Sequence, residues 1–205
     1  MATACIPQLT FKCYPQTKTV ARFDQAQAST DGGVVLLKAL DDRLQLTDRL
    51  AACLPDRRDP DKVRHAVRDL LRQRIFGLAC GYEDGNDAAR LADDPLHKLA
   101  VGRDPVTGDA LASQPTLSRF ENAASPRALY RMGRMLASTV IAQHRHRLNG
   151  RAQRITIDLD PTDDPTHGQQ ELAFFNGHYD TWCYLPLVGT LTFNDEADQY
   201  LVAIV

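Results

Sequence analysis

Residues 155–160 alternate strictly between apolar and polar side chains, and this short stretch constrains the fold more than any other. The apolar positions are Ile155, Ile157 and Leu159, and the polar positions are Thr156, Asp158 and Asp160. A period of two is typical of a β-strand, in which alternate side chains point to opposite faces. Pro161 has no N–H to donate to a neighbouring strand, so it should end this one. Two carboxylates about 7 Å apart would therefore lie on one face at the end of the strand.

Such a pair of acidic side chains has two interpretations. Carboxylate oxygens are the ligands that hard divalent cations such as Mg²⁺ prefer, and a strand end that faces a cleft is a suitable place for them. Alternatively, Asp160 and the polar residues after it form the edge of a strand that runs into an Asx-type turn. The alternation alone leaves both interpretations open.

Charge is distributed unevenly along the chain, although the formal net charge is only −2. Residues 122–157 contain seven arginines and no acidic residue, whereas residues 158–205 contain nine acidic residues and no lysine or arginine. This asymmetry indicates an anionic polymer as the partner of the basic segment and metal binding by the acidic one. Chance segregation, or pairing of the two segments in the folded protein, explains it equally well.

Upstream of the strand, the hydrophobic pattern predicts helices. Apolar residues at helical spacing favour short helices within residues 34–54 and a better-defined helix over residues 61–78. Arg64, Arg68 and Arg72 are four residues apart on that helix, a spacing that suits contact with a phosphate backbone. The alternative is a solvated face that is partly paired with nearby acidic residues.

Two further helices carry polar and basic residues that suit contact with nucleic acid. Residues 113–122, with Pro115 in the first turn, have the size and composition of a recognition helix. A longer helix begins after Ser125 and carries arginines on its polar side. The candidate DNA-binding residues are Thr116, Ser118, Arg119, Arg127 and Arg131. Ordinary surface helices have the same composition, so the pattern alone leaves that alternative open.

The remaining chain completes the expected fold class. Residues 163–177 are polar, and residues 179–191 and 199–205 have the branched and aromatic composition of strands. We therefore predict an α+β protein, in which an amino-terminal helical bundle precedes three antiparallel strands in consecutive hairpins. The five cysteines show no zinc-like Cys-x-x-Cys spacing and fit a reducing cytoplasm. No apolar run approaches the roughly 20 residues that a membrane helix needs.

Several segments together resemble a known family. They are Thr30 to Gly33, Ser113 to Asn122, Ile155 to Pro165, His167 to Gln170 and Tyr179 to Leu187. In this order they resemble the bacterial insertion-sequence transposases of the DDE domain group 1. The catalytic domain of that family has a ribonuclease H-like fold, and its first strand carries an Asp-x-Thr signature, here Asp160-Pro161-Thr162.

The resemblance implies a site, a cofactor and a partner. Asp160 would be the catalytic carboxylate and a ligand of Mg²⁺ or Mn²⁺, with Asp158 as the second candidate for the metal. The partner would be the DNA at the ends of an insertion element, and the full-length protein would form a homodimer. The reaction would be DNA transposition by metal-dependent strand cleavage and transfer.

The resemblance also implies residues that this sequence does not contain. The family needs a second Asp and a Glu further along the chain, so we expect a carboxy-terminally truncated form that does not cleave DNA. The expected domains are an arm and short strand (1–23), a helical DNA-binding region (24–150) and the start of an incomplete ribonuclease H-like domain (151–205). An unpaired strand edge should then lie beside Asp160. The alternatives are a non-catalytic DNA-binding fragment, a pseudogene remnant, or an unrelated metal-dependent hydrolase with its site within residues 158–180.

Overall fold

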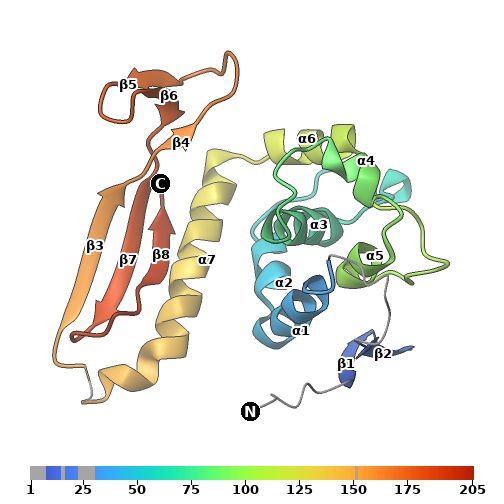
Figure 1. Cartoon of the computed structure of the whole chain (residues 1–205), viewed down its shortest axis with the longest axis horizontal. Coiled ribbons are helices and arrows are strands. Elements are labelled where there is room, and N and C mark those ends of the chain that lie inside the picture. Colours follow the sequence, from blue (N-terminus) through green and yellow to red (C-terminus); the bar gives the residue numbers. More distant parts are fainter. Residues whose placement is uncertain (1–7, 15–16, 23–30, 151) are drawn as a thin grey trace, which may run out of the picture. The chain divides into compact units, whose positions relative to one another are not determined.

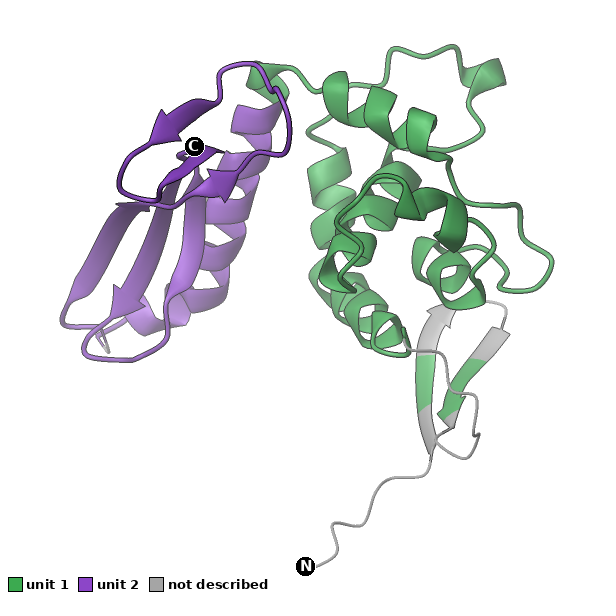
Figure 2. Ribbon diagram, turned by 45° about the horizontal axis from the view of Figure 1, so that its top comes forward, with its two compact units in different colours: residues 1–128 green, residues 129–205 purple. Residues whose placement is uncertain are grey.

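The chain forms two compact units, residues 1–128 and residues 129–205 (Figure 2). The computed structural model describes residues 8–14, 17–22, 31–150 and 152–205. The first unit is mainly helical, and the second contains two small antiparallel sheets and most of a long helix (Figure 1). The protein is therefore α+β, as the sequence predicts.

The first unit begins with a β-hairpin and continues as a set of helices. Its elements are β1 (Gln8–Tyr14), β2 (Thr17–Arg22), α1 (Val34–Leu44), α2 (Leu46–Ala51), the short 3₁₀ helix η1 (Pro60–Lys62), α3 (Val67–Ala79), α4 (Asp87–Leu91), α5 (Pro95–Val101) and α6 (Gln114–Asn122). Antiparallel β1 and β2 pair with each other. Residues 8–14, which lie within the predicted arm, form a strand that is paired with β2.

Helix α3 lies at the centre of the first unit and contributes to two hydrophobic clusters. On one side, Phe76 packs with Val34 and Val35 of α1 and with Leu99 and Ala100 of α5. A second cluster joins α3 to α4 and α6 through Leu70, Ala88, Ala112 and Leu117. Burial of these side chains from water holds the helices around α3.

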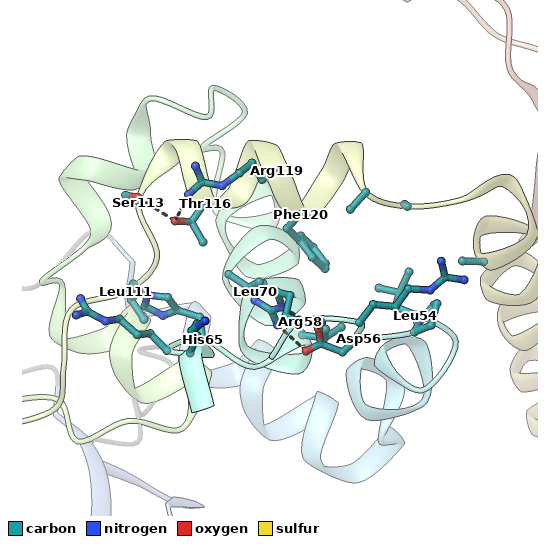
Figure 3. A pocket seen from close by; sticks show the side chains of 18 of the residues that line it. Leu54, Asp56, Arg58, His65, Leu70, Leu111, Ser113, Thr116, Arg119 and Phe120 are labelled. Carbon is teal, nitrogen blue, oxygen red and sulfur yellow. Dashed lines mark hydrogen bonds and ion pairs between the residues drawn. The ribbon is translucent and has the colours of Figure 1, made fainter. Parts of the chain in front are cut away.

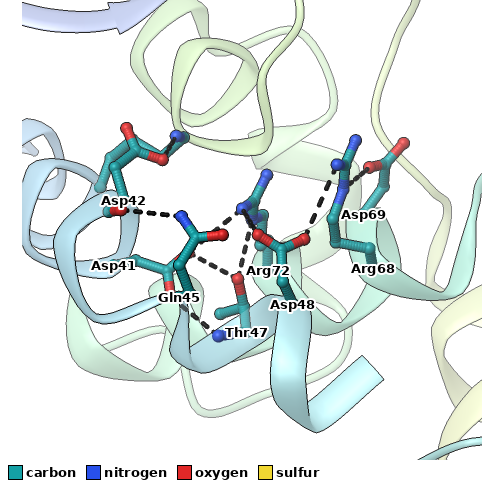
Figure 4. A network of polar contacts seen from close by, with 9 residues as sticks. Asp41, Asp42, Gln45, Thr47, Asp48, Arg68, Asp69 and Arg72 are labelled. Carbon is teal, nitrogen blue, oxygen red and sulfur yellow. Dashed lines mark hydrogen bonds and ion pairs between the residues drawn. The ribbon is translucent and has the colours of Figure 1, made fainter. Parts of the chain in front are cut away.

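A buried polar network joins the ends of α1 and α2 to α3 (Figure 4). The guanidinium of Arg72 donates to Thr47 Oγ1 at 2.9 Å and to Asp48 Oδ2 at 3.1 Å, and it lies 3.3 Å from Asp41 Oδ2. Asp41 also accepts the backbone N–H of Thr47 at 2.8 Å. Arg72 and Asp41 are both 5% exposed. Because a buried charge must be paired, this arginine holds helices together and does not face solvent.

Of the two interpretations of this arginine spacing, contact with a phosphate backbone is therefore wrong for Arg72, and the partly paired, solvated face is confirmed for Arg68. Arg72 is buried in the network, and Arg68 lies near the carboxylates of Asp48 and Asp69. The helix itself begins at Val67 and not at residue 61, so Arg64 precedes it. The physical reason is that Asp59 caps a separate turn at η1, after which the backbone at Val63 is extended.

The second unit combines a long helix with two small sheets. Its elements are α7 (Pro126–His144), the 3₁₀ helix η2 (Arg145–Leu148), β3 (Ile155–Pro161), β4 (Asp164–Pro165), β5 (Phe174–Asn176), β6 (Thr181–Tyr184), β7 (Leu187–Phe193) and β8 (Tyr200–Ile204). One sheet has the order β3-β7-β8 and the other β4-β6-β5, and all pairs are antiparallel. At the end of α7, the ring of His144 lies 4.0 Å from that of Tyr200 and 5.6 Å from that of Phe193.

Two details of the predicted strands were wrong. Residues 179–191 form two strands, β6 and β7, that belong to different sheets. Pro186 lies between them, and its missing N–H cannot continue a ladder. The strands β3, β7 and β8 are also not consecutive hairpins, because the β4-β6-β5 sheet is inserted between β3 and β7 in the sequence. The incomplete ribonuclease H-like arrangement stays a prediction.

The compact units divide within α7, after Ala128, whereas the sequence placed a boundary after Gly150. Most of α7 therefore groups with the strands that follow it. The functional meaning of the predicted domains stays a prediction. No helix in the described parts of the chain is both long enough and apolar enough to cross a bilayer.

Candidate functional site

Asp158 and Asp160 lie on one face of β3, a strand whose residues are all exposed. Opposite residues in an antiparallel pair share a face, and here Asp158 pairs with Thr190 and Asp160 with Val188. The other face carries Ile155 opposite Phe193, whose buried ring contacts His144 of α7. The two carboxylates therefore point away from the face that α7 contacts, and both residues are exposed. The predicted strand and the shared face of its acidic side chains agree with the structure.

Local packing fixes this orientation. Gly189 pairs with Leu159, and a Cβ at position 189 would lie 3.1 Å from Leu159 Cδ2 and 3.2 Å from Ala203 Cβ. A side chain at this position would require Leu159 to turn or the strands to shift. After Pro161, the N–H of Thr162 donates to the carbonyl of Pro186 at 3.0 Å, which carries the chain from one sheet to the next.

The second edge of β3 has no partner strand in the part of the chain that the structure describes. The apolar side chains beside it are largely exposed, with Ile157 at 64% and Leu159 at 60%. An unpaired edge beside exposed aliphatic groups promotes association with other chains. The predicted unpaired edge next to Asp160 is therefore confirmed for the described residues.

Asp158 and Asp160 fit only part of a metal site. Among residues 8–14, 17–22, 31–150 and 152–205, no group of three or more histidine, cysteine, aspartate or glutamate side chains is arranged to hold a metal ion. A divalent cation of this kind normally takes several oxygen ligands, including carboxylates. The described residues thus supply two carboxylates without a third protein ligand beside them. Their role as metal ligands stays a prediction.

The first unit contains an open cleft of about 1210 Å³ between α6 and the segment that precedes α3 (Figure 3). Its basic side chains are Arg57, Arg58, Lys62, Arg64, His65, Arg103 and Arg119, and its acidic ones are Asp56 and Asp109. Leu54, Leu70, Leu111 and Phe120 are among its apolar side chains. We call this the basic cleft. Its charge favours an anionic ligand.

Some cations of the basic cleft are already paired. Arg58 binds Asp56 with a nitrogen–oxygen distance of 2.7 Å, and this hydrogen bond lowers the pKa of Asp56 to about 2. Arg103 donates to His65 Nδ1 at 2.8 Å and to the carbonyl of Asp109 at 3.2 Å. Burial and the nearby charge of Arg103 lower the pKa of His65 from its ordinary value of 6.5. Near neutral pH this histidine is therefore uncharged and accepts a hydrogen bond from Arg103.

Other cations of the basic cleft are available for a ligand. In the described part of the chain, Arg57, Arg64 and Arg119 form no ion pair with an acidic side chain. Arg119 donates only weakly to Thr116 Oγ1, at 3.4 Å. All three are exposed, so their charges attract an anion without first breaking a salt bridge.

The structure brings together some of the predicted DNA-binding residues. Thr116 and Arg119 of α6 both line the basic cleft. Ser118 does not line it and instead accepts a bond from Asn122 at its carbonyl. Arg127 and Arg131 belong to α7 and do not line it either.

Sequence reasoning missed the cations of the segment before α3 and of the loop after α5, notably Arg57, Arg58, Lys62 and Arg103. The sequence feature that points to most of them is the cluster of basic residues within 57–64, which a search for helical periodicity does not detect.

Comparison with known proteins adds a family. The sequence model of the family described as transposase DDE domain group 1 matches residues 11–205. No curated protein and no solved structure matches the chain. The match spans both the basic cleft and β3 with its Asp-x-Thr segment. Proteins of this family are transposases, which bind DNA and generally use divalent metal ions. The chain therefore belongs to the transposase DDE domain group 1 family.

Proposed function

We propose that this protein acts in the transposition of an insertion element, with Asp160 as the catalytic, metal-binding carboxylate and Asp158 as its neighbour. The observation that carries the proposal is the family match, combined with the exposed position of Asp160 at the end of β3. Strand cleavage and transfer are phosphoryl-transfer reactions, in which bound Mg²⁺ or Mn²⁺ activates the attacking oxygen and stabilises the leaving one.

The chain's own contribution follows from its geometry. A strand that is paired along its whole length holds Asp160 in a fixed place, and Pro161 directs the chain away from the carboxylate. In the first unit, Arg119 and Thr116 bind the phosphate backbone of the element end. We expect this chain by itself to bind DNA. It should bind metal only weakly, because no third protein ligand lies beside the two carboxylates in the described residues.

A second function is favoured by that same observation. A DNA-binding fragment without catalysis needs the basic cleft but no complete carboxylate set. The two functions differ in whether the bound DNA is cut.

Both proposals are tested with an end-labelled duplex that carries the element terminus. The chain is incubated with it at low salt in Mg²⁺ or Mn²⁺, and binding and cleavage are followed together. Metal-dependent cleavage that is lost in Asp160→Asn, but kept in the exposed control Asp180→Asn, supports the catalytic function in this chain. Binding without cleavage supports the DNA-binding function. Absence of binding at low salt contradicts both.

The phosphate contacts have their own measurement. Neutralising one cation that binds a phosphate should lower the slope of log affinity against log salt by about 0.9 for a duplex. Arg119→Ala should therefore weaken binding and reduce the salt dependence. Arg43→Ala removes an exposed arginine of α1 that does not line the basic cleft and should change neither quantity.

A further inference from the structure

The basic cleft differs from a surface built for duplex DNA, because its floor is apolar. Phe120 and Leu54 are partly exposed in the cleft, and Phe120 lies above the buried Leu70 in Figure 3. A duplex hides the flat faces of its bases in the stack and offers mainly phosphates and base edges to a protein. A base that has left the stack can pack on an exposed aromatic side chain such as this one.

The shape of the cleft points the same way. At about 1210 Å³ it exceeds the roughly 300–1,000 Å³ of a site for one drug-sized ligand. It is concave, whereas the phosphates of a duplex lie on a convex surface. A short stretch of unpaired strand has the length and flexibility to follow such a hollow.

The exposed cations of the cleft belong to two different segments. Arg119 comes from α6, whereas Arg57 and Arg64 come from the segment before α3, and none has an acidic partner in the described residues. A single strand presents phosphates along one side and bases along the other. The three arginines would hold the phosphates while a base stacks on Phe120.

His65 adds a flat, uncharged ring to this surface. Its Nδ1 accepts from Arg103, so the proton is on Nε2 and remains free to donate to a base or phosphate oxygen. The desolvation that comes with its half-buried position keeps the ring neutral near pH 7.

We propose that the basic cleft binds an unpaired DNA strand, with a base stacked on Phe120 and phosphates on Arg57, Arg64 and Arg119. This inference rests on the proposed function, in which DNA is the partner. It names the form of DNA that the cleft takes.

The test compares a short fluorescein-labelled DNA strand with a blunt hairpin duplex of the same sequence and with an RNA strand, by anisotropy at low salt. The full chain should bind the DNA strand about tenfold more tightly than the duplex, because bases that are stacked inside the duplex cannot stack on Phe120. Equal or tighter binding of the duplex overturns the inference, and so does clearly tighter binding of the RNA.

Variants assign the effect to residues. Phe120→Leu keeps an apolar side chain on the floor but removes the aromatic face, and it should weaken binding of the DNA strand about tenfold while leaving duplex binding unchanged. Arg64→Ala should lower the single-strand salt slope by about 0.7, whereas Arg43→Ala should not. An unchanged affinity in a folded Phe120→Leu variant, checked by circular dichroism, overturns the stacking role.

The outcomes also separate this inference from the proposed function. If element-end duplex binds tightly while single strands bind no better and Phe120→Leu has no effect, the inference fails and the proposed function stands. If no DNA binds at low salt, the proposed function itself fails.

Discussion

His144 is packed between aromatic rings, which makes its protonation costly. It contacts Tyr200 and Phe193, and its Nδ1 is buried without a hydrogen-bond partner in the described structure. Burial lowers the pKa of His144 from 6.5, and the nearby charges of Arg147 and His146 lower it further, opposed by Glu196. A group with a depressed pKa in the folded state binds its proton more readily when unfolded. The neutral ring thus contributes stability that is complete above pH 6.5 and is lost as the pH falls through the folded pKa.

We expect His144→Phe to reduce this pH dependence. The phenyl ring keeps the aromatic packing and cannot take up a proton. Urea unfolding followed by fluorescence at about pH 7.5 and about pH 5.5 should show a smaller loss of stability for the variant than for the unchanged chain. His167→Gln, at an exposed position after β4, is the control. An equal loss in His144→Phe would contradict the assignment, because His65 would then account for the pH dependence of the chain.

Asp41 and Arg72 form a buried ion pair whose disruption should be costly. Asp41→Ala leaves the Arg72 guanidinium buried with one carboxylate fewer and removes the acceptor for the Thr47 N–H. Removing one partner of such a pair typically costs about 3–5 kcal/mol of the free energy of unfolding. The half-exposed Arg68 pairs loosely with Asp48, so Arg68→Ala should cost only about 0–1 kcal/mol. Equilibrium denaturation of both variants checks the difference, and similar losses would contradict a structural role for the network.

At the scale of elements, the β3-β7-β8 sheet depends on the absence of a side chain at one position. Gly189→Val would place its Cβ against Leu159 and Ala203, so either the Leu159 side chain must turn or the strands must shift. Overpacking of this kind typically costs about 1–3 kcal/mol. The matched control is Gly133→Ala in α7, where nothing lies within 4 Å of the new Cβ. Because alanine is the better helix former, this control should gain about 0.5–1 kcal/mol. Thermal unfolding of both variants gives the sign of each change in stability. An unchanged stability in Gly189→Val would contradict the packing described for this position.

Element prediction from the sequence succeeded where one local signal was sufficient. The alternation of residues 155–160 and the Ser125-Pro126 start of α7 define their elements without help from the rest of the chain. Ser125 Oγ accepts the N–H of Ala128 at 3.3 Å, as expected of a cap. Prediction failed where tertiary contacts decide. Arg72 looks like a surface residue by spacing and becomes buried only because Asp41, Thr47 and Asp48 surround it.

The candidate site likewise has one part that could be predicted from the sequence and one part that could not. The acidic pair of β3 could be placed from the strand period alone. The basic cleft could not, because its wall residues come from separate segments on either side of α3 and meet only in the folded unit. Of the predicted contacts, Thr116 and Arg119 line this cleft, whereas Arg127 lies on the next helix, outside the lining.

At the scale of the whole molecule, hydrophobic burial is concentrated in the first unit. Both core clusters lie there, around α3. Between residues 129 and 205, apart from position 151, the buried hydrophobic side chains are Cys183 and Phe193. Regions with few buried apolar contacts open at lower free energy. Amide hydrogen exchange should therefore be faster in β3 and β8 than in α3 and α5, as followed by mass spectrometry of peptides. Equal protection in the two units would contradict this order of stability.

The pairing of Leu159 with Gly189 has a genetic consequence. Because neighbouring side chains of a strand face opposite ways, an in-frame insertion of one codon between Leu159 and Asp160 would turn the second carboxylate to the side that Phe193 occupies. The hydrophobic pairing upstream would survive, so the product would still fold with its acidic pair divided between two faces. Drift in this gene should therefore tolerate exchanges of exposed side chains along β3 far better than any change in the length of that segment.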